Sequence, residues 1–212
     1  MIPCLNEEAT IAEVVTAVKR YFEKVMVVDD GSTDQTAMRA EKAGAAVLRN
    51  ATSLGKGAAL RKGWDRLREE GFQWAISLDG DGQHAPNDIP AFFRCAEEMT
   101  PSLVVGNRMH CLDSMPWVRR AVNRWMSRRL SKATGITLPD SQCGFRLMNL
   151  ADYSTLQLRT SHFEVESEVL LAFVKAGKRV EFVPIRTIYK AEQSKISPVK
   201  DTIRWFRWWW RA

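Results

Sequence analysis

The sequence predicts one α/β domain, with or without a small appendage, in which helices cover both faces of a mostly parallel sheet. Three observations support this fold class. The 212 residues are enough to bury a real core. Short apolar runs of strand length recur along the chain, and most are followed by a segment with helical periodicity. Two of these runs, ending at Val28 and Leu78, lead directly into acidic loops that contain glycine.

Seven strands are expected from apolar and β-branched runs that turn residues interrupt. The first is a stub of three residues, and the run Val-Met-Val-Val at 25–28 is the second. The run Ala-Ile-Ser-Leu at 75–78 has the composition of a buried strand. In chain order, the expected strands are residues 1–3, 25–28, 45–48, 75–78, 103–106, 180–184 and 187–189.

The helices expected in the core are residues 7–20, 36–43, 56–70, 86–99 and 163–176. Asn6 can cap the first of them, and Glu7 then lies near the positive end of the helix dipole. Pro86 suits the first turn of its helix. Gly71 and Gly177 each follow a helical segment, at a position where a left-handed residue commonly ends a helix.

The stretch Asp-Gly-Asp-Gly-Gln-His at 79–84 is the most informative in the chain. Asp79 and Asp81 are one residue apart at the end of a strand, where two neighbouring carboxylates repel each other. A divalent cation would offset that repulsion, because hard cations prefer oxygen ligands and can bridge a carboxylate to a diphosphate. A surface turn with solvated aspartates is the alternative, since Asp-Gly is a common turn dipeptide.

A second acidic loop, Asp-Asp-Gly-Ser-Thr-Asp at 29–34, follows the strand expected at 25–28. Open parallel sheets bind ligands outside the carboxyl ends of their strands, so the two acidic loops predict one shared site. A nucleotide fits such a site, with one acidic group on the ribose or base and the other pair holding a metal on the diphosphate. Ser32 and Thr33 have an alternative role, which is to cap the helix expected at 36–43.

Five segments occur in an order that resembles the inverting family 2 glycosyltransferases of GT-A fold. They are Ile-Pro-Cys-Leu-Asn-Glu-Glu at 2–8, Val-Asp-Asp-Gly-Ser-Thr-Asp at 28–34, Gly-Lys-Gly at 55–57, Asp-Gly-Asp-Gly-Gln-His at 79–84 and Asp-Ser-Gln-Cys-Gly-Phe-Arg at 140–146. The closest branch is the polyprenyl-phosphate (dolichyl-phosphate) mannosyl- and glucosyltransferases. The resemblance covers nearly the whole chain, but it does not fix the sugar. One departure is the very short first strand, which leaves the nucleoside pocket near Pro3 and the native start of the chain open.

The resemblance implies a Rossmann-like GT-A domain that is a metal-dependent, inverting hexosyltransferase. It assigns Mg²⁺ or Mn²⁺ to Asp79 and Asp81, with Gln83 near the metal and the diphosphate. In this assignment Asp81 is a direct ligand, and Asp79 is shared between metal and nucleotide. The ion would act as a Lewis acid and a template for the departing diphosphate. The residues implied to surround the nucleoside are Pro3, Leu5, Glu7, Asp29 and Asp30.

The same resemblance implies that arginines contact the phosphate of the acceptor. A polyprenyl phosphate is itself an anionic nucleophile, so it needs cations more than it needs a strong general base. Arg108 and Arg146 stand where the family places phosphate-contacting or transition-state-facing groups. Arg119 or Arg120 could add a further contact. An ion pair within the fold is the alternative for Arg146.

Two more segments have open roles. Lys195 lies in a late loop similar to that of the branch and could pair with the diphosphate when the loop closes, or it could be solvated. Gly-Lys-Gly at 55–57 is not a Walker-type phosphate loop, because no Ser or Thr follows the lysine. The helix that it opens could still offer backbone N–H groups to an anion, or the glycines could serve tight packing.

Two segments hold the positive charge of this chain, whose formal net charge is +6. Residues 117–132 carry six basic residues and no acid, and residues 195–212 carry five basic residues and one acid. In the first segment, helical spacing separates an apolar face from a basic one that holds Arg120, Arg124 and Arg128. The expected apolar face consists of Val118, Ala121, Val122, Trp125 and Met126.

In the second segment, Trp205, Trp208 and Trp209 share one face of a helix, and arginines share another. Three consecutive tryptophans at 208–210 cannot all be buried on one face, so one of them needs another partner. Tryptophan and arginine on a short amphipathic helix suit an anionic membrane interface. We therefore predict interfacial helices at 117–134 and 194–212. The alternatives are a core helix with solvated arginines and a contact in a homo-oligomer.

Composition also narrows the possible location and partners of the protein. No apolar run approaches the ~20 residues that span a bilayer, and the start of the chain lacks the basic leader of a signal peptide. The four cysteines have neither zinc-site nor disulfide spacing, which favours reduced thiols in the cytosol. A basic protein could bind nucleic acid, but no nucleic-acid-binding motif is present. The expected location is cytoplasmic and peripheral to the inner face of the membrane.

The sequence thus predicts a glycosyltransferase domain at 1–193 followed by a basic, tryptophan-rich tail at 194–212. The expected reaction moves a hexose from a donor of the GDP-mannose or UDP-glucose type to a polyprenyl phosphate. Two alternatives stay open. One is a family 2 enzyme that acts on a hydroxyl acceptor, and the other is a non-catalytic nucleotide-binding module at the membrane.

Overall fold

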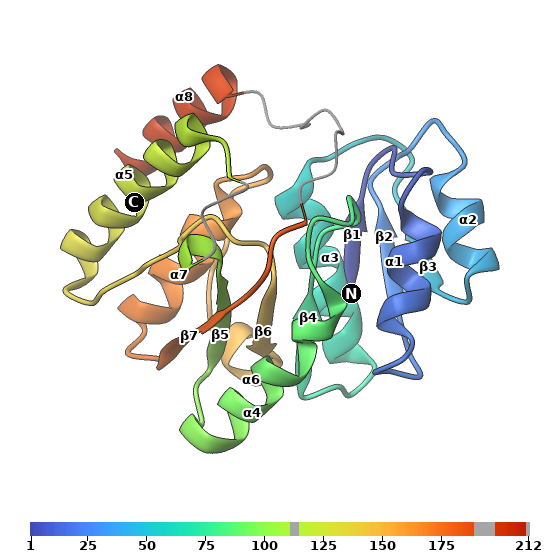
Figure 1. Ribbon diagram of the computed structural model, residues 1–212, viewed down its shortest axis with the longest axis horizontal. Helices are drawn as coiled ribbons and strands as arrows, with labels where there is room; N and C mark the ends of the chain where they lie inside the picture. The colour runs from blue at the N-terminus through green and yellow to red at the C-terminus, as the bar shows by residue number, and fades with distance from the viewer. Residues whose placement is uncertain (111–114, 189–197, 211–212) are drawn as a thin grey trace.

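The structure is a computed structural model that describes residues 1–110, 115–188 and 198–210 (Figure 1). Its described part contains seven strands in two hydrogen-bonded sheets. The parallel sheet has the order β1-β2-β3, with strands β1 (Ile2–Cys4), β2 (Met26–Asp29) and β3 (Ala46–Arg49). The other has the order β4-β6-β5-β7, with strands β4 (Trp74–Ser77), β5 (Leu103–Asn107), β6 (Arg146–Asn149) and β7 (Val180–Pro184).

Met1 joins the two sheets. Its amino group donates to the Ile76 carbonyl at 2.8 Å, and its carbonyl accepts from the Leu78 amide at 3.3 Å. Met1 therefore bonds the two residues on either side of Ser77. This is the hydrogen-bond pattern of two parallel strands. Figure 1 shows β1 beside β4, so the seven strands form one twisted surface through the molecule.

The expected α/β class is confirmed, but the sheet is mixed and not mostly parallel. Strand β6, which the sequence analysis did not predict, runs antiparallel to both β4 and β5. Its apolar run is short and lies between Arg146 and Asn149, so its local strand signal is weak. The strand expected at 187–189 is wrong in its described part, because Thr187 makes only a single bridge with His84.

The helices are α1 (Ile11–Val18), α2 (Thr36–Lys42), α3 (Lys56–Glu69), α4 (Ile89–Met99), α5 (Trp117–Thr134), α6 (Leu150–Tyr153), α7 (Val165–Lys175) and α8 (Pro198–Trp209). The first begins later than expected, and Asn6 does not cap it. Asn6 has a positive φ of 51° and accepts a hydrogen bond from the Thr33 amide at 2.9 Å. It therefore ties the loop after β1 to the loop after β2.

Helices cover both faces of the sheet. On one face α3 contacts α6 and α7, and on the other α1 contacts α2 and the short 3₁₀ helix that leads into α4. Trp64 of α3 is fully buried with its ring 5.4 Å from Tyr153, and Phe92 of α4 stacks on Phe145 at 4.4 Å. The sheet thus has an aromatic cluster on each face, which fixes its strands beneath the loops of the site.

Helix α8 packs beside α5, against α7 (Figure 1). The Trp205 side chain is buried, its Nε1 donates to Ser167 Oγ at 2.8 Å, and its ring lies 5.4 Å from that of Trp125. Trp208 and Trp209 are partly buried on the same inward face, as expected, whereas Trp210 is 85% exposed. No helix in the described ranges is both long and apolar enough to cross a membrane.

The face that α5 buries differs from the expected one. Val118, Ala121 and Val122 are exposed, and the buried residues are Asn123, Met126, Ser127 and Leu130. Asn123 and Ser127 face inward because they bond polar groups of the loop before β6. Asn123 Nδ2 donates to Asp140 Oδ1 at 2.9 Å, and Ser127 Oγ accepts from the Ser141 amide at 3.0 Å.

Candidate active site

The acidic loop at 79–84 follows β4 and packs against the loop that follows β1. Thr10 Oγ1 donates to the Gly80 carbonyl at 2.7 Å. A Cβ placed on Gly80 would lie 3.1 Å from the Cys4 side chain and 3.4 Å from the Pro3 carbonyl oxygen. A larger residue at this position would crowd these two loops. The structure thus brings the acidic loop together with the segment that holds Pro3, Leu5 and Glu7.

Asp79 belongs to a chain of ion pairs. Its Oδ1 lies 2.6 Å from Lys56 Nζ, which is also 2.7 Å from Glu166 Oε1 of α7. Burial opposes the charge on Asp79, but the ammonium of Lys56 and the other nearby positive charges together outweigh burial, and the pKa of Asp79 falls to about 2. Burial likewise opposes the charge on Lys56, yet the two carboxylates raise the pKa of this lysine. Asp79 and Lys56 are therefore both charged at neutral pH.

Asp81 is in the opposite electrostatic situation. Burial raises the pKa of Asp81, and the neighbouring charge of Asp79 raises it further. Its Oδ1 accepts from the Gln83 amide at 2.9 Å, which closes a tight turn. Beside it, His84 is buried, its Nδ1 accepts from the Asp79 amide at 3.2 Å, and burial lowers the pKa of this imidazole. His84 thus supports the backbone of the loop through this hydrogen bond.

These residues fit a divalent cation. Two nearby carboxylates, one of them with its pKa raised by the other, would both be stabilised as anions by a shared ion. Gly144 faces them, because a Cβ at this residue would lie 2.9 Å from both carboxylate oxygens of Asp79. In the described ranges, no group of three or more His, Cys, Asp or Glu side chains forms a metal cage. Mg²⁺ commonly uses one or two carboxylates plus substrate phosphates, so two suffice.

Asp30 is a fully engaged carboxylate. Its Oδ1 accepts from Asn50 Nδ2 at 2.7 Å and from the Leu54 amide at 3.0 Å. Its Oδ2 accepts from Ser53 Oγ at 2.7 Å and from the Gly55 amide at 2.8 Å. Burial opposes its charge, but these donors lower the pKa of Asp30. The carboxylate thus anchors the loop that delivers Lys56 to Asp79.

One carboxylate oxygen of Asp29 has no hydrogen bond among the described residues. The Asp29 side chain is buried, and its Oδ1 accepts from the Ser32 amide at 2.9 Å. Its Oδ2 lies 3.1 Å from Arg49 Nε as an ion pair, but the geometry gives that oxygen no hydrogen bond. Arg49 is a largely exposed side chain. An acceptor without a hydrogen bond beneath an exposed arginine suits a ribose or base donor.

Arg108, at the end of β5, is held by a buried carboxylate. Its Nε and Nη2 donate to the two oxygens of Asp140 at 2.8 and 2.9 Å, a bidentate pair. Burial opposes the charge on Asp140, but the guanidinium of Arg108 lowers the pKa of that carboxyl. Asn123 of α5 bonds the same carboxylate, so α5 and β5 are joined at this point. Arg119 and Arg120 are half-buried at the start of α5.

Arg146 lies inside the fold and is only 2% exposed. Its Nε donates to the Cys143 carbonyl at 2.7 Å and its Nη2 to the Ser141 carbonyl at 3.2 Å. Burial lowers the pKa of this guanidinium. Among the described residues, the hydrogen bonds of Arg146 go to backbone carbonyls. The alternative of an ion pair would require a carboxylate in their place. Arg146 thus supports the loop that carries Gly144 past Asp79.

The sequence analysis missed two charged groups of the site, and a third group that it predicted lies outside the described residues. Lys56 was considered only for its backbone, although its ammonium bridges Asp79 and Glu166. Glu166 is a buried acid within the apolar helix α7, and an acid at a buried helical position is a signal that could have found it. Lys195 lies outside the described residues.

Comparisons with known proteins agree with this architecture. The chain is similar in fold to glucosyl-3-phosphoglycerate synthase from Mycobacterium tuberculosis in complex with Mn²⁺, UDP and phosphoglyceric acid, with a TM-score of 0.74 and 21% identity over 97% of this chain and 73% of the other. It is 31% identical to an uncharacterized protein of Methanocaldococcus jannaschii, over 89% of this chain and 80% of the relative.

Two relatives have names that state an activity. The chain is 28% identical to the UDP-N-acetylglucosamine–dolichyl-phosphate N-acetylglucosaminyltransferase of Methanococcus voltae, over 89% of this chain and 84% of the relative. It is 24% identical to the dolichyl-phosphate beta-glucosyltransferase of Saccharomyces cerevisiae, over 96% of this chain and 70% of the relative. Residues 1–156 match the sequence model of glycosyl transferase family 2. The resemblance seen in the motifs is therefore confirmed, and the chain belongs to glycosyl transferase family 2 and is a glycosyltransferase.

Proposed function

We propose that this enzyme transfers a hexose from a nucleotide sugar to a polyprenyl phosphate at the cytoplasmic face of a membrane, and that it depends on Mg²⁺ or Mn²⁺. The observation that carries the proposal is the position of Asp79 and Asp81 in the loop after β4, which packs against the loop after β1, itself tied to the loop after β2. The names of two relatives include a dolichyl-phosphate acceptor, and the structural relative was solved with Mn²⁺ and UDP. Both observations support the proposed substrates and metal.

The donor side rests on carboxylates that the fold holds in place. Asp79 and Asp81 would hold the cation, with Gln83 close by in the same loop, and Asp29 would accept a donor from the nucleoside. A divalent ion there supplies Lewis acidity that stabilises the departing diphosphate. Lys56, at the start of α3, helps to keep Asp79 ionised. The ion pair with Glu166 in turn holds Lys56 in position. Pro3, Leu5 and Glu7 would border the nucleoside, whereas Asp30 acts by anchoring the loop at 50–55.

The acceptor side needs cations. A polyprenyl phosphate is largely ionised at neutral pH, so no residue has to remove a proton from it before it attacks the sugar. Arg108, which Asp140 orients, would meet that phosphate. Arg119 and Arg120 would add positive charge from α5. Arg146 would act from beneath, by holding the loop at 141–143.

Transfer should require a phosphate on the lipid. In an assay with a nucleotide hexose, Mn²⁺ and either polyprenyl phosphate or the matching polyprenol, we expect glycolipid and free nucleotide only with the phosphate. Equal transfer to the polyprenol would favour a hydroxyl acceptor. Absence of turnover with all GDP- and UDP-hexoses, together with unchanged nucleotide affinity in Asp81→Ala, would favour a non-catalytic module.

A membrane surface on α5 and α8 would bring the enzyme to its lipid. Large apolar side chains are exposed on both helices, among them Trp117 and Val118 on α5 and Ile203 and Trp210 on α8. The ring of Phe206 lies 5.1 Å from that of Trp125, so the two helices are joined along this side. Arginines border these residues, as in helices that bind anionic interfaces. This combination supports peripheral binding by the two helices.

The double substitution Ile203→Ser and Trp210→Ser should weaken binding to anionic vesicles about thirtyfold or more, because interfacial burial of each such side chain is worth ~1 kcal/mol or more. The two side chains are 50% and 85% exposed, so the fold should tolerate the change. Co-sedimentation measures the effect. A matched control is Leu54→Ser with Phe72→Ser, at residues 54% and 40% exposed outside α5 and α8. Equal loss in both double variants would contradict a specific membrane surface.

A further inference from the structure

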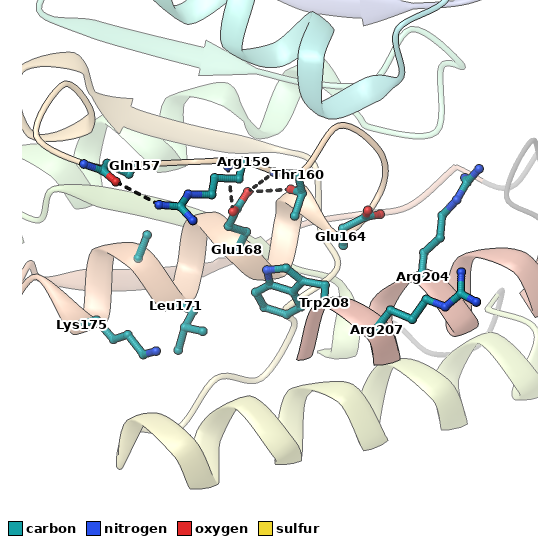
Figure 2. Close-up of a pocket in the computed structure, with 11 residues that line it drawn as sticks. Gln157, Arg159, Thr160, Glu164, Glu168, Leu171, Lys175, Arg204, Arg207 and Trp208 are labelled. Atoms are coloured by element: carbon teal, nitrogen blue, oxygen red, sulfur yellow. Dashed lines mark hydrogen bonds between the residues drawn. The ribbon is translucent and has the colours of Figure 1, made fainter. Parts of the chain in front are cut away.

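A cavity of about 670 Å³ lies between α7, α8 and the loop at 157–164 (Figure 2). Among the residues that the structure describes, none of those predicted for sugar transfer lines it. Its volume is within the range of sites that hold small ligands. Figure 2 shows Arg159 and Lys175 toward one end and Arg204 and Arg207 toward the other, with Trp208 between them.

The charge of this cavity is positive. Among the described residues that line it, four carry basic side chains and two carry carboxylates. One carboxylate, Glu168, is fully engaged by the loop, because its Oε1 accepts from the Arg159 amide at 2.8 Å and its Oε2 from the amide and hydroxyl of Thr160 at 2.9 and 2.6 Å. Glu168 thus shapes the wall of the cavity and is bonded to the backbone, not to the lining guanidiniums. An anion is the ligand that this lining favours.

The second carboxylate, Glu164, points to a further property of the ligand. Its Oε2 is buried and, within the described residues, has no hydrogen-bond partner. Buried acceptors are normally satisfied, so a ligand that donates a hydrogen bond here would be favoured. In Figure 2 Glu164 lies on the same side of Trp208 as Arg207. A phosphate and a hydroxyl on one ligand would meet both groups.

The position of the cavity indicates where such a ligand comes from. At 100° per residue, Arg204, Arg207 and Trp208 occupy one side of α8, and Phe206, which touches Trp125 of α5, occupies another. The exposed residues Ile203 and Trp210 lie between these two sides. The cavity therefore borders the surface that we assign to the membrane.

We infer that this cavity binds the headgroup of an anionic, hydroxyl-bearing phospholipid, with the phosphate beside Arg207 and a hydroxyl donating to Glu164. The inference rests on the proposed membrane role of α8, and it adds a lipid site distinct from the residues proposed for sugar transfer. A headgroup held there would orient the enzyme on the bilayer as well as attract it.

Calorimetric titration with short-chain lipids below their micelle concentration tests the site without vesicles or turnover. Dihexanoyl phosphatidylglycerol should bind with saturation. Dihexanoyl phosphatidylcholine, which has the same chains without net charge, and inorganic phosphate should each bind at least about tenfold more weakly. Equal binding of the phosphatidylcholine would overturn the inference, and equal binding of inorganic phosphate would reassign the cavity to free phosphate.

Substitutions locate the binding. Arg207→Ala should weaken phosphatidylglycerol binding about tenfold, whereas Arg128→Ala, at an exposed arginine of α5 outside the cavity, should leave it unchanged. Glu164→Ala, which removes the acceptor, should weaken the binding of phosphatidylglycerol and should not weaken that of inorganic phosphate. Binding that tolerates Arg207→Ala would refute the site even if the enzyme transfers sugar as proposed. Conversely, if sugar transfer failed, these titrations would still decide whether the cavity binds the lipid headgroup.

Discussion

Replacing Asp81 with asparagine should lower the rate of sugar transfer by about 10²–10³-fold, the usual loss when one electrostatic group at a reacting centre is removed. The asparagine keeps the shape of the turn that Gln83 closes but removes the charge from the candidate cation site. Single-turnover transfer at saturating donor measures the loss. Titration with Mn²⁺ in the absence of substrate should show weaker binding, which separates a lost ligand from a disturbed fold.

Asp65→Asn provides the matched control. Asp65 is also a partly buried aspartate, but it accepts a hydrogen bond from Tyr153 at 3.0 Å and lies on α3. We expect its activity and Mn²⁺ affinity to remain near those of the natural protein. If Asp81→Asn transferred sugar at an undiminished rate, the acidic loop would not be the catalytic centre.

Replacing Asp140 with alanine should destabilise the fold by ~3–5 kcal/mol, the range measured when one partner of a buried ion pair is removed. The change leaves the guanidinium of Arg108 and the amide of Asn123 without their acceptor, in a place that water reaches poorly. Urea denaturation measures the free energy of unfolding. The melting temperature should fall by roughly 10 °C for a domain of this size.

The surface pair of Asp152 and Lys178 provides the comparison. Both side chains are partly exposed, so Asp152→Ala should cost less than about 1 kcal/mol. Acidification offers a second check. Because the pKa of Asp140 is lowered in the folded state, its contribution is complete above the unfolded pKa of about 4 and is lost as the pH falls through the folded pKa. An equal effect of the two substitutions would contradict the assigned role of Asp140.

Local sequence was sufficient for the parts of the fold that each segment specifies by itself. The runs before Asp29 and Asp79 are strands that deliver acidic loops, because short apolar runs that end in turn residues favour buried strands. Gly71 and Gly177 follow their helices with φ of 86° and 68°, a conformation that glycine adopts without strain. The spacing of Trp205, Trp208 and Trp209 identified the inward face of α8 because helical geometry fixes it.

Only the tertiary structure decided how these parts serve a site. Strand β6 is antiparallel because the chain enters between β4 and β5 from the opposite end, a matter of topology that a run of four residues does not encode. Lys56 meets Asp79 and Glu166, and Arg108 meets Asp140, across long stretches of sequence. The pKa values of these groups depend on burial and on neighbours that only folding supplies. The sequence by itself determined the family and the acidic loops, whereas the fold decided which charges are paired and which acceptors remain for ligands.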